Sequence, residues 1–145
     1  VYHLWLTTKD AALIHHYMAD LYRARALAPQ SIFWIYAGKS FVMNERPFEA
    51  IAELEVAVEL ADGKRDPGLR AMARAWFGAA LAQLGEGDKA LMVWLDAIAL
   101  APDDPNTYDF FPWARHLAKP LRERLLQGVP PARKGELERA LAERG

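Results

Sequence analysis

Apolar residues recur every three or four positions along most of the chain, and proline and glycine interrupt the pattern. This period is typical of helices that bury one face. Strict alternation of apolar and polar residues, which would indicate strands, is rare, and Ala and Leu outnumber β-branched residues in the periodic stretches. The pattern therefore predicts an all-α fold. The expected helices cover residues 9–27, 31–43, 47–61, 67–84 and 88–100.

Prolines mark the starts and interruptions of these helices. Pro47 stands where a first-turn proline is tolerated, and Asp66-Pro67 has the form of a helix cap followed by such a proline. Further prolines after Pro102 predict short, bent helices between residues 106 and 127. At the C-terminal end we expect a linker over residues 128–131 and, over residues 135–145, a helix of at most three turns that needs a docking surface.

Residues 31–62 align with residues 71–102 at an offset of 40. Small residues at the same place in both helices of a pair let antiparallel helices approach closely, while large neighbours fill the flanks. The alignment therefore predicts a helical hairpin that occurs twice. The aligned pairs are Gly38 with Gly78, Ala50 with Ala90, Leu54 with Trp94, Ala57 with Ala97, and Ala61 with Ala101.

The first copy contains Trp34-x2-Ala37-Gly38-x2-Phe41 and then Ala50-x3-Leu54, and the second contains Phe77-Gly78, Ala90-x3-Trp94 and a final Pro102. This arrangement resembles the tetratricopeptide repeat, whose pattern runs W-x2-L-G-x2-Y, A-x3-F and P over 34 residues. Asp62 replaces the proline in the first copy, Arg74 replaces the first aromatic residue in the second, and a connector at 63–68 accounts for the longer period. The resemblance implies antiparallel hairpins stacked as a short α-solenoid. Partial units extend it over roughly residues 9–113, and an irregular helical bundle is the alternative.

The tetratricopeptide family binds partners along a concave surface lined by the first helix of each hairpin. Carried over to this sequence, the groove is mostly apolar and suits an amphipathic helix or apolar segment of a partner protein. Because Lys39 is the one available residue of the family's carboxylate clamp, binding of chaperone tails is not expected. The chain's own C-terminal helix or upstream sequence is an alternative occupant. The groove positions are Ile32, Ile35, Lys39, Val42, Met43, Met72, Ala75, Ala79, Ala82 and Gln83, with Asp109, Trp113 and His116 from a partial third unit.

Residue types that support catalysis are scarce. There is no cysteine, and neither Ser31 nor Ser40 lies in a strand–turn–helix elbow. His16 and Asp20 form a single suggestive metal-binding pair, which is too few ligands for a site. We therefore predict a protein that is not an enzyme and holds no cofactor or metal. A site around Asp109, Arg115 and His116 is the catalytic alternative.

The remaining charged and aromatic residues are interpreted as surface and core residues of the helical fold. The glutamates at 45, 49 and 53, and those at 55 and 59, have the spacing of a solvated helix face, with an acidic docking patch as the alternative. Trp34, Trp76 and Trp94 are expected in the core, and Trp113 at the surface. Net charge is −1. Residues 114–145 carry eight basic residues, but four acidic residues among them dilute that charge, so no nucleic-acid partner is expected.

The overall organisation follows from these features. The sequence begins without Met and its first six residues are apolar, so we expect residues 1–8 to be the edge of a longer chain. Residues 9–127 would form the repeat domain, and residues 128–145 the linker and terminal helix. No apolar run is long enough to span a bilayer, and we expect a cytoplasmic protein, with periplasmic or membrane-associated placement left open. The expected function is a non-catalytic scaffold or adaptor; the alternative is a regulatory or assembly-factor module of a larger protein, with or without a membrane anchor.

Overall fold

The computed structural model describes residues 19–20, 23 and 31–142. Within these ranges the regular structure is helical and contains no strand, which confirms the all-α prediction for this part of the chain. Most of the helix expected at residues 9–27 lies outside the described residues. The elements are α3 (Ser31–Met43), α4 (Pro47–Asp62), α5 (Pro67–Gln83), α6 (Gly87–Leu100), the 3-10 helices η1 (Pro105–Tyr108) and η2 (Phe111–His116), α7 (Lys119–Gly128) and α8 (Pro131–Ala142).

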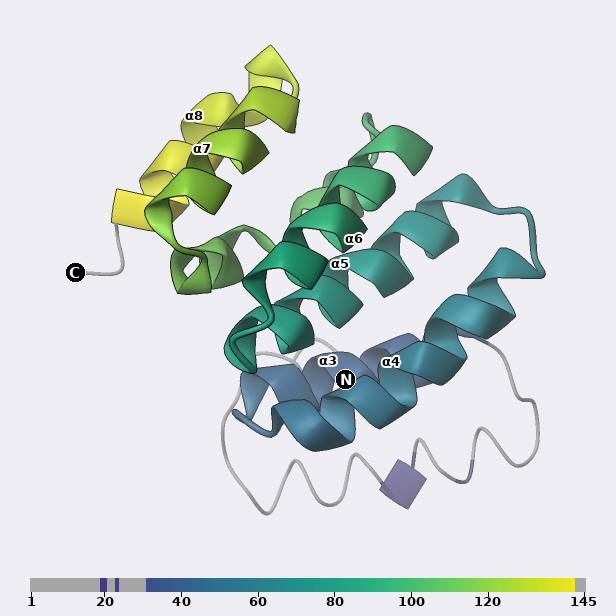
Figure 1. The fold of residues 1–145 in the computed structure, drawn as a ribbon. Coiled ribbons are helices and arrows are strands. Elements are labelled where there is room, and N and C mark those ends of the chain that lie inside the picture. The colour runs from purple at the N-terminus through teal and green to yellow at the C-terminus, as the bar shows by residue number, and fades with distance from the viewer. Residues whose placement is uncertain (1–18, 21–22, 24–30, 143–145) are drawn as a thin grey trace.

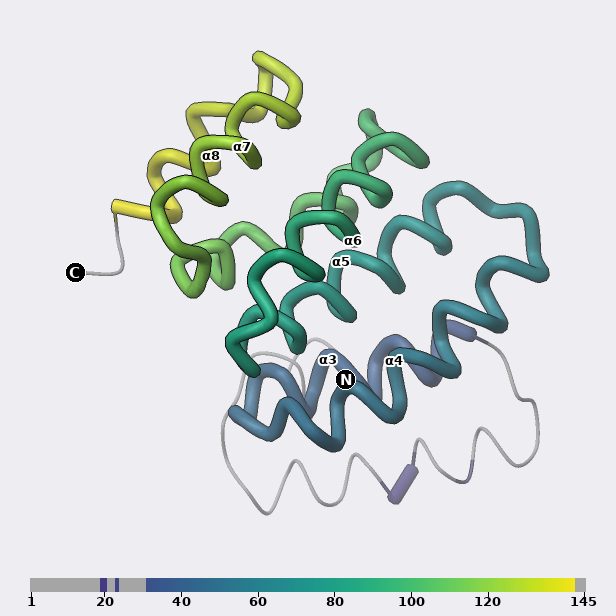
Figure 2. The backbone as a smooth tube through the Cα atoms, in the orientation of Figure 1, coloured from purple at the N-terminus to yellow at the C-terminus, as the bar shows by residue number. Residues whose placement is uncertain are grey.

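Helices adjacent in sequence pack against each other. The pairs α3–α4 and α5–α6 are antiparallel hairpins, and α5 also contacts both α4 and α3 (Figure 1). The tube in Figure 2 can be followed from this four-helix body through η1 and η2 into the α7–α8 pair. There, α7 packs against α6 and α8 against η2. The elements on the α3 side of the body, α3, α5 and η2, therefore come from three separate parts of the chain.

The helix starts agree with the prediction from proline and aspartate. Pro47 and Pro67 each begin a helix, and the Asp66 carboxylate accepts a hydrogen bond from the Leu69 amide at 3.2 Å. This cap satisfies one of the amide groups that the first helical turn leaves without a partner. The connector between the hairpins thus ends where α5 is nucleated.

The repeated glycines lie at the closest approach within each hairpin. A Cβ atom at Gly38 would stand 2.8 Å from Leu54 Cδ1, and one at Gly78 would stand 2.5 Å from Trp94 Cδ1. Neither space holds a methyl group, because real Cβ atoms do not approach other carbon atoms so closely. This confirms the prediction that small residues let the helices of each hairpin approach one another.

The turns inside the two hairpins also correspond. In the second, Gly85 has φ +82°, and the Glu86 amide donates to the Leu81 carbonyl at 2.9 Å. In the first, Glu45 has φ +59°, and the Arg46 amide donates to the Phe41 carbonyl at 2.8 Å. Both are Schellman turns that end a helix with a left-handed residue. Glu45 is exposed, as the solvated-face interpretation expects, but it lies in this turn and not on a helix with Glu49 and Glu53.

The segment after α6 forms short helices, as its prolines predict. Thr107 Oγ1 donates to the Ala101 carbonyl at 2.7 Å, and Tyr108 Oη donates to the Pro102 carbonyl at 2.5 Å. These bonds tie η1 to the end of α6. The fully buried Phe110 ring stacks on Trp94 at a centroid distance of 4.4 Å, so this segment shares the hydrophobic core.

The C-terminal helix begins earlier than predicted. Pro131 opens α8, so the linker expected at 128–131 reduces to Val129 and Pro130 between α7 and α8. A proline at the first helical position costs no hydrogen bond, which is why a residue taken as a breaker can start a helix. Leu137 is fully buried, and the Arg133 guanidinium lies 4.9 Å from the centre of the Tyr108 ring. The helix therefore has the docking surface that it was predicted to need.

Candidate binding groove

Four of the predicted groove residues form a packed floor. Ile35, Val42, Ala75 and Ala79 have no exposed surface in the described structure. Ala82, on the same side of α5, is 2% exposed. Small side chains on α5 let α3 and the 3-10 segment pack closely against it, and the side chains between these elements are therefore buried. These five residues therefore belong to the core and offer almost no surface that a partner could contact.

The other predicted residues are accessible to different degrees. His116 is exposed, and the rest are half-buried. Among the half-buried side chains the apolar ones pack against the core with part of their surface facing solvent. They come from α3, α5 and the segment around η2, and α5 contacts both α3 and η2. The half-buried set is Ile32, Lys39, Met43, Met72, Gln83, Asp109 and Trp113.

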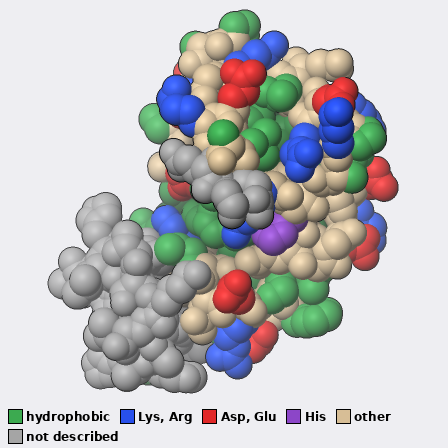
Figure 3. Space-filling model, turned by 90° about the vertical axis from the view of Figure 1, so that its left-hand side faces the viewer, with side chains coloured by type: hydrophobic (Ala, Val, Ile, Leu, Met, Phe, Trp, Pro, Cys, Tyr) green, Lys and Arg blue, Asp and Glu red, His purple; other side chains and the backbone are tan. Residues whose placement is uncertain are grey.

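A hollow of about 330 Å³ lies where the end of α3, the α3–α4 turn, the end of α5 and η2 meet. This volume is at the lower end of the range for small-molecule pockets, roughly 300–1,000 Å³, and α8 contributes none of its lining. Figure 3 shows the side of the molecule that carries α7 and α8. The lining combines predicted groove residues (Val42, Met43, Gln83, Trp113, His116) with Glu45, Pro47 and Arg115.

Glu45, Pro47 and Arg115 were not predicted as groove residues. The left-handed backbone of Glu45 brings it to the rim of the hollow, where the aligned position of the second hairpin is Gly85. A left-handed non-glycine residue costs about 1–2 kcal/mol. The repeat offset of 40 aligns Glu45 with Gly85, a charged residue with a glycine. This alignment could have indicated that Glu45 has an unusual backbone conformation.

A cluster of charged and aromatic side chains adjoins the hollow; we call Lys39, Trp76, Asp109 and Trp113 the central cluster. The Lys39 ammonium lies 5.0 Å from the centre of the Trp76 ring. Trp113 meets Trp76 edge-on, with ring centroids 5.0 Å apart and an interplanar angle of 67°. A cation over the face of an indole is attracted by the ring quadrupole. Trp76, which is 3% exposed, thus supports both Lys39 and Trp113 from beneath.

Burial shifts the titration of both charged members of the central cluster. It lowers the pKa of Lys39, while the charge of Asp109 acts in the opposite direction. It raises the pKa of Asp109, and Lys39 and the Trp76 indole favour the ionised carboxylate. No ion pair or hydrogen bond joins Lys39 to Asp109, and the Trp76 N–H lies near Asp109 without reaching hydrogen-bonding geometry. The two opposite charges are therefore partly desolvated, and each influences the pKa of the other without an ion pair between them.

Gln83 links the two hairpins at the edge of the hollow. Its Nε2 donates to the Val42 carbonyl at 3.0 Å, which satisfies an acceptor near the end of α3. Its Oε1 is buried and accepts no hydrogen bond among the described residues. The side chain therefore fixes the spacing of α3 and α5 at the hollow.

The residues of the catalytic alternative are not assembled as a reactive site. Arg115 donates to the Pro112 carbonyl at 2.5 Å, and no hydrogen bond joins the side chains of Asp109, Arg115 and His116 in the part of the chain described. Burial and then Arg115 lower the pKa of His116, and Glu45 opposes that shift. Within the described ranges no group of three or more acidic, histidine or cysteine side chains could hold a metal ion. His16 lies outside these ranges, and Asp20 pairs with Arg23.

No protein-family model, curated protein or solved structure matches this chain. Within the described residues no helix combines the length and the hydropathy that a bilayer-spanning segment requires.

Proposed function

We propose that the chain is a tetratricopeptide-like stack of helical hairpins that binds a segment of another protein along the face formed by α3, α5 and η2. The observation that carries this proposal is the central cluster beside the 330 Å³ hollow. Half-buried apolar and aromatic side chains surround a small number of polar groups there. Such a composition is typical of binding sites.

The geometry of the hairpins supports the repeat interpretation. The same glycine contact and the same left-handed turn recur 40 residues apart, and α5 contacts both helices of the preceding hairpin. Successive hairpins in contact create a continuous surface from their first helices, which is the surface that repeat proteins use for binding. An adaptor or scaffold would use such a surface to hold its partner.

The second candidate is a regulatory or assembly-factor module of a larger protein. In that case the groove would hold a segment of the same polypeptide or of a fixed subunit. The central cluster and the hollow would serve in the same way, so both candidates share one test of the surface.

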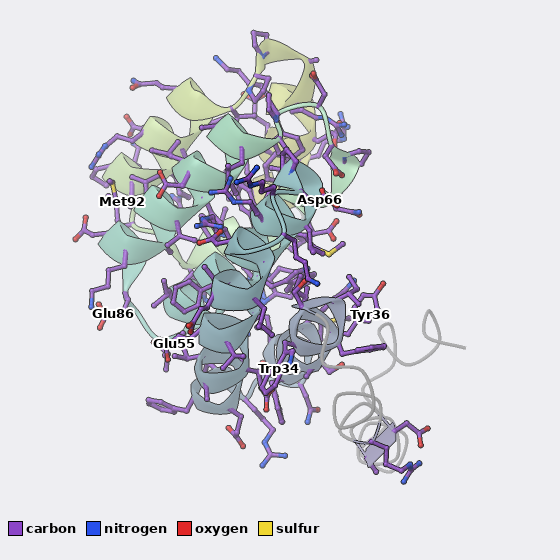
Figure 4. All side chains as sticks on the ribbon, turned by 90° about the vertical axis from the view of Figure 1, so that its right-hand side faces the viewer. Trp34, Tyr36, Glu55, Asp66, Glu86 and Met92 are labelled. Atoms are coloured by element: carbon purple, nitrogen blue, oxygen red, sulfur yellow. The ribbon has the colours of Figure 1, made fainter. Side chains whose placement is uncertain are left out.

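The test compares two methionine substitutions that introduce the same charge. Met43 lines the hollow, whereas Met92 is 56% exposed on α6, away from the α3 side chains in Figure 4. Wild type, Met43→Asp and Met92→Asp would each be immobilised and incubated with native lysate, and the bound proteins quantified by mass spectrometry. We expect Met43→Asp to lose partners that wild type and Met92→Asp retain. Equal retention by both variants, with unchanged helical circular dichroism, would refute the groove.

A further inference from the structure

Glu45 holds a costly backbone conformation at the rim of the hollow. Its φ of +59° lies in the left-handed region that favours glycine, and such residues destabilise a fold and cluster at functional sites. Within the described residues no hydrogen bond or ion pair engages the Glu45 carboxylate, because the neighbouring Arg46 pairs with Glu49 at 2.7 Å. The fold therefore gains no contact from this carboxylate that would offset the cost of the turn.

Arg115 brings the opposite charge to the same hollow. It comes from η2, whereas Glu45 comes from the turn between α3 and α4, and both residues line the hollow. Arg115 Nη1 donates to the Pro112 carbonyl at 2.5 Å, which leaves other N–H groups of the guanidinium for a ligand. No ion pair joins Glu45 to Arg115 in the part of the chain described, so each charge is available. Because burial lowers the pKa of His116, its imidazole is mostly uncharged at neutral pH, and the hollow carries one charge of each sign.

Most of the remaining lining is apolar. Met43, Pro47 and Trp113 contribute to it, and the volume of about 330 Å³ accommodates a large apolar side chain. Methionine adapts to side chains of irregular shape, so the hollow itself places a weak demand on which apolar residue enters. Exposed charges at the rim of an interface act mainly on specificity and on the association rate. Selection of the partner therefore depends on Glu45 and Arg115.

We propose that the hollow takes one large apolar side chain of a partner segment, and that Glu45 and Arg115 select segments with a basic residue on one side of it and an acidic residue on the other. This inference rests on the proposed function, because it specifies the partner of the same face. A segment with two like charges would be repelled at Glu45 or at Arg115, and an uncharged segment would gain from neither. The left-handed turn is retained because it holds the carboxylate at the rim.

Random linear peptides displayed on phage provide the probe. The full chain would be immobilised as wild type, Glu45→Gln and Arg115→Gln, and the enriched peptides would be aligned on their large apolar residue. With wild type we expect Lys or Arg at one flanking position and Asp or Glu at another. Glu45→Gln should remove only the basic preference, and Arg115→Gln only the acidic one. Glu86→Gln in the turn of the second hairpin and Arg124→Gln on α7 change exposed residues outside the hollow lining and should retain both preferences.

Synthetic peptides then measure the size of each preference. Replacing the basic residue of a selected peptide by Gln should weaken binding to wild type about two- to fivefold, mainly through slower association, as expected for exposed charge pairs. This difference should shrink at high salt and vanish in Glu45→Gln. Glu45→Gly should lose the same preference without unfolding, because it relieves the left-handed turn. Its control is Arg65→Gly, which relieves a φ of +60° in the connector between the hairpins and should bind as wild type does.

The outcomes separate this inference from the proposed function. Peptides that depend on Met43 but show no charge preference would overturn the inference and leave the proposed function standing. A basic preference that persists in Glu45→Gln, or an acidic one that persists in Arg115→Gln, would also overturn it. Self-association of wild type that Met43→Asp abolishes, measured by sedimentation, would assign the hollow to a second copy of the chain instead. Enrichment no better than that of a blank support would overturn the proposed function, and this inference with it.

Discussion

Substitution of Gly78 by alanine tests the packing that holds the second hairpin together. The new methyl group would stand 2.5 Å from Trp94 Cδ1. Trp94 cannot easily move, because it is fully buried, stacks on Phe110 and donates its indole N–H to the Ala75 carbonyl at 3.0 Å. The helices must separate or the indole must leave its hydrogen bond.

The size of the effect follows from three contributions. Overpacking a core costs about 1–3 kcal/mol. A buried donor that loses its acceptor costs a further 1–3 kcal/mol or so. Alanine returns about 1 kcal/mol, because glycine is unfavourable inside a helix. We therefore expect Gly78→Ala to lower the free energy of unfolding by about 3 kcal/mol, within limits of about 1–5 kcal/mol.

Urea unfolding, followed by circular dichroism and tryptophan fluorescence, measures this change. Gly135→Ala is the control: its methyl group would meet Arg139 Nη1 at 3.5 Å, an ordinary contact, so we expect about 0.5–1 kcal/mol of stabilisation. Gly38→Ala should cost less than Gly78→Ala, because Leu54 can change rotamer and donates no hydrogen bond. If Gly78→Ala is as stable as wild type, close approach does not hold the hairpin.

Three further predictions concern charged residues. Glu45→Gly should raise the free energy of unfolding by about 1 kcal/mol by relieving the left-handed backbone, measured as a higher urea midpoint. Asp62→Asn should lower the free energy of unfolding by about 0.5–1 kcal/mol at neutral pH. The reason is that Asp62 accepts hydrogen bonds from Arg74 at 2.8 and 2.9 Å and from Arg70 at 3.1 Å. Those hydrogen bonds, that of Arg74 first, lower the pKa of Asp62, so the wild-type advantage exists above the ordinary aspartate pKa and disappears as pH falls through the lowered one. Lys39→Met should leave the melting temperature unchanged or higher, because burial lowers the pKa of Lys39, which means that the fold destabilises the charged ammonium relative to solvent. A clear loss of stability would mean that the contact with Trp76 outweighs desolvation.

The fold was predictable where local chemistry decides it. Asp66 and Pro67 begin α5, and Gly38 and Gly78 identify where each hairpin is closest, because capping, first-turn proline and the lack of a side chain act locally. The start of α8 was missed, because a proline can either end a helix or begin one. Whether Pro131 does one or the other depends on the docking of Leu137, which is a tertiary effect.

The site was predictable only in part, because periodicity gives the face of a residue but not its depth. Ile35 and Ala79 have the spacing of groove residues and are fully buried, since α3 and α5 approach each other closely. Trp113, expected at the surface, is half-buried against Trp76. Lys39 and Asp109 were both predicted as groove positions, but their effect on each other's pKa was not predictable, because they come from helix α3 and from the irregular segment between η1 and η2.

The glycine contacts and the central cluster are linked by the same geometry. Gly78 sets the distance of α6 from α5, and Trp94 on α6 positions Phe110, which directly follows Asp109. On the opposite side of α5, Trp76 carries Lys39 and meets Trp113. We therefore expect a displacement of Trp94 to move Phe110 and, with it, the neighbouring residues of the segment between η1 and η2. Gly78→Ala should accordingly weaken capture of the partners that wild type retains, even under conditions in which the variant remains folded, whereas Gly135→Ala should not.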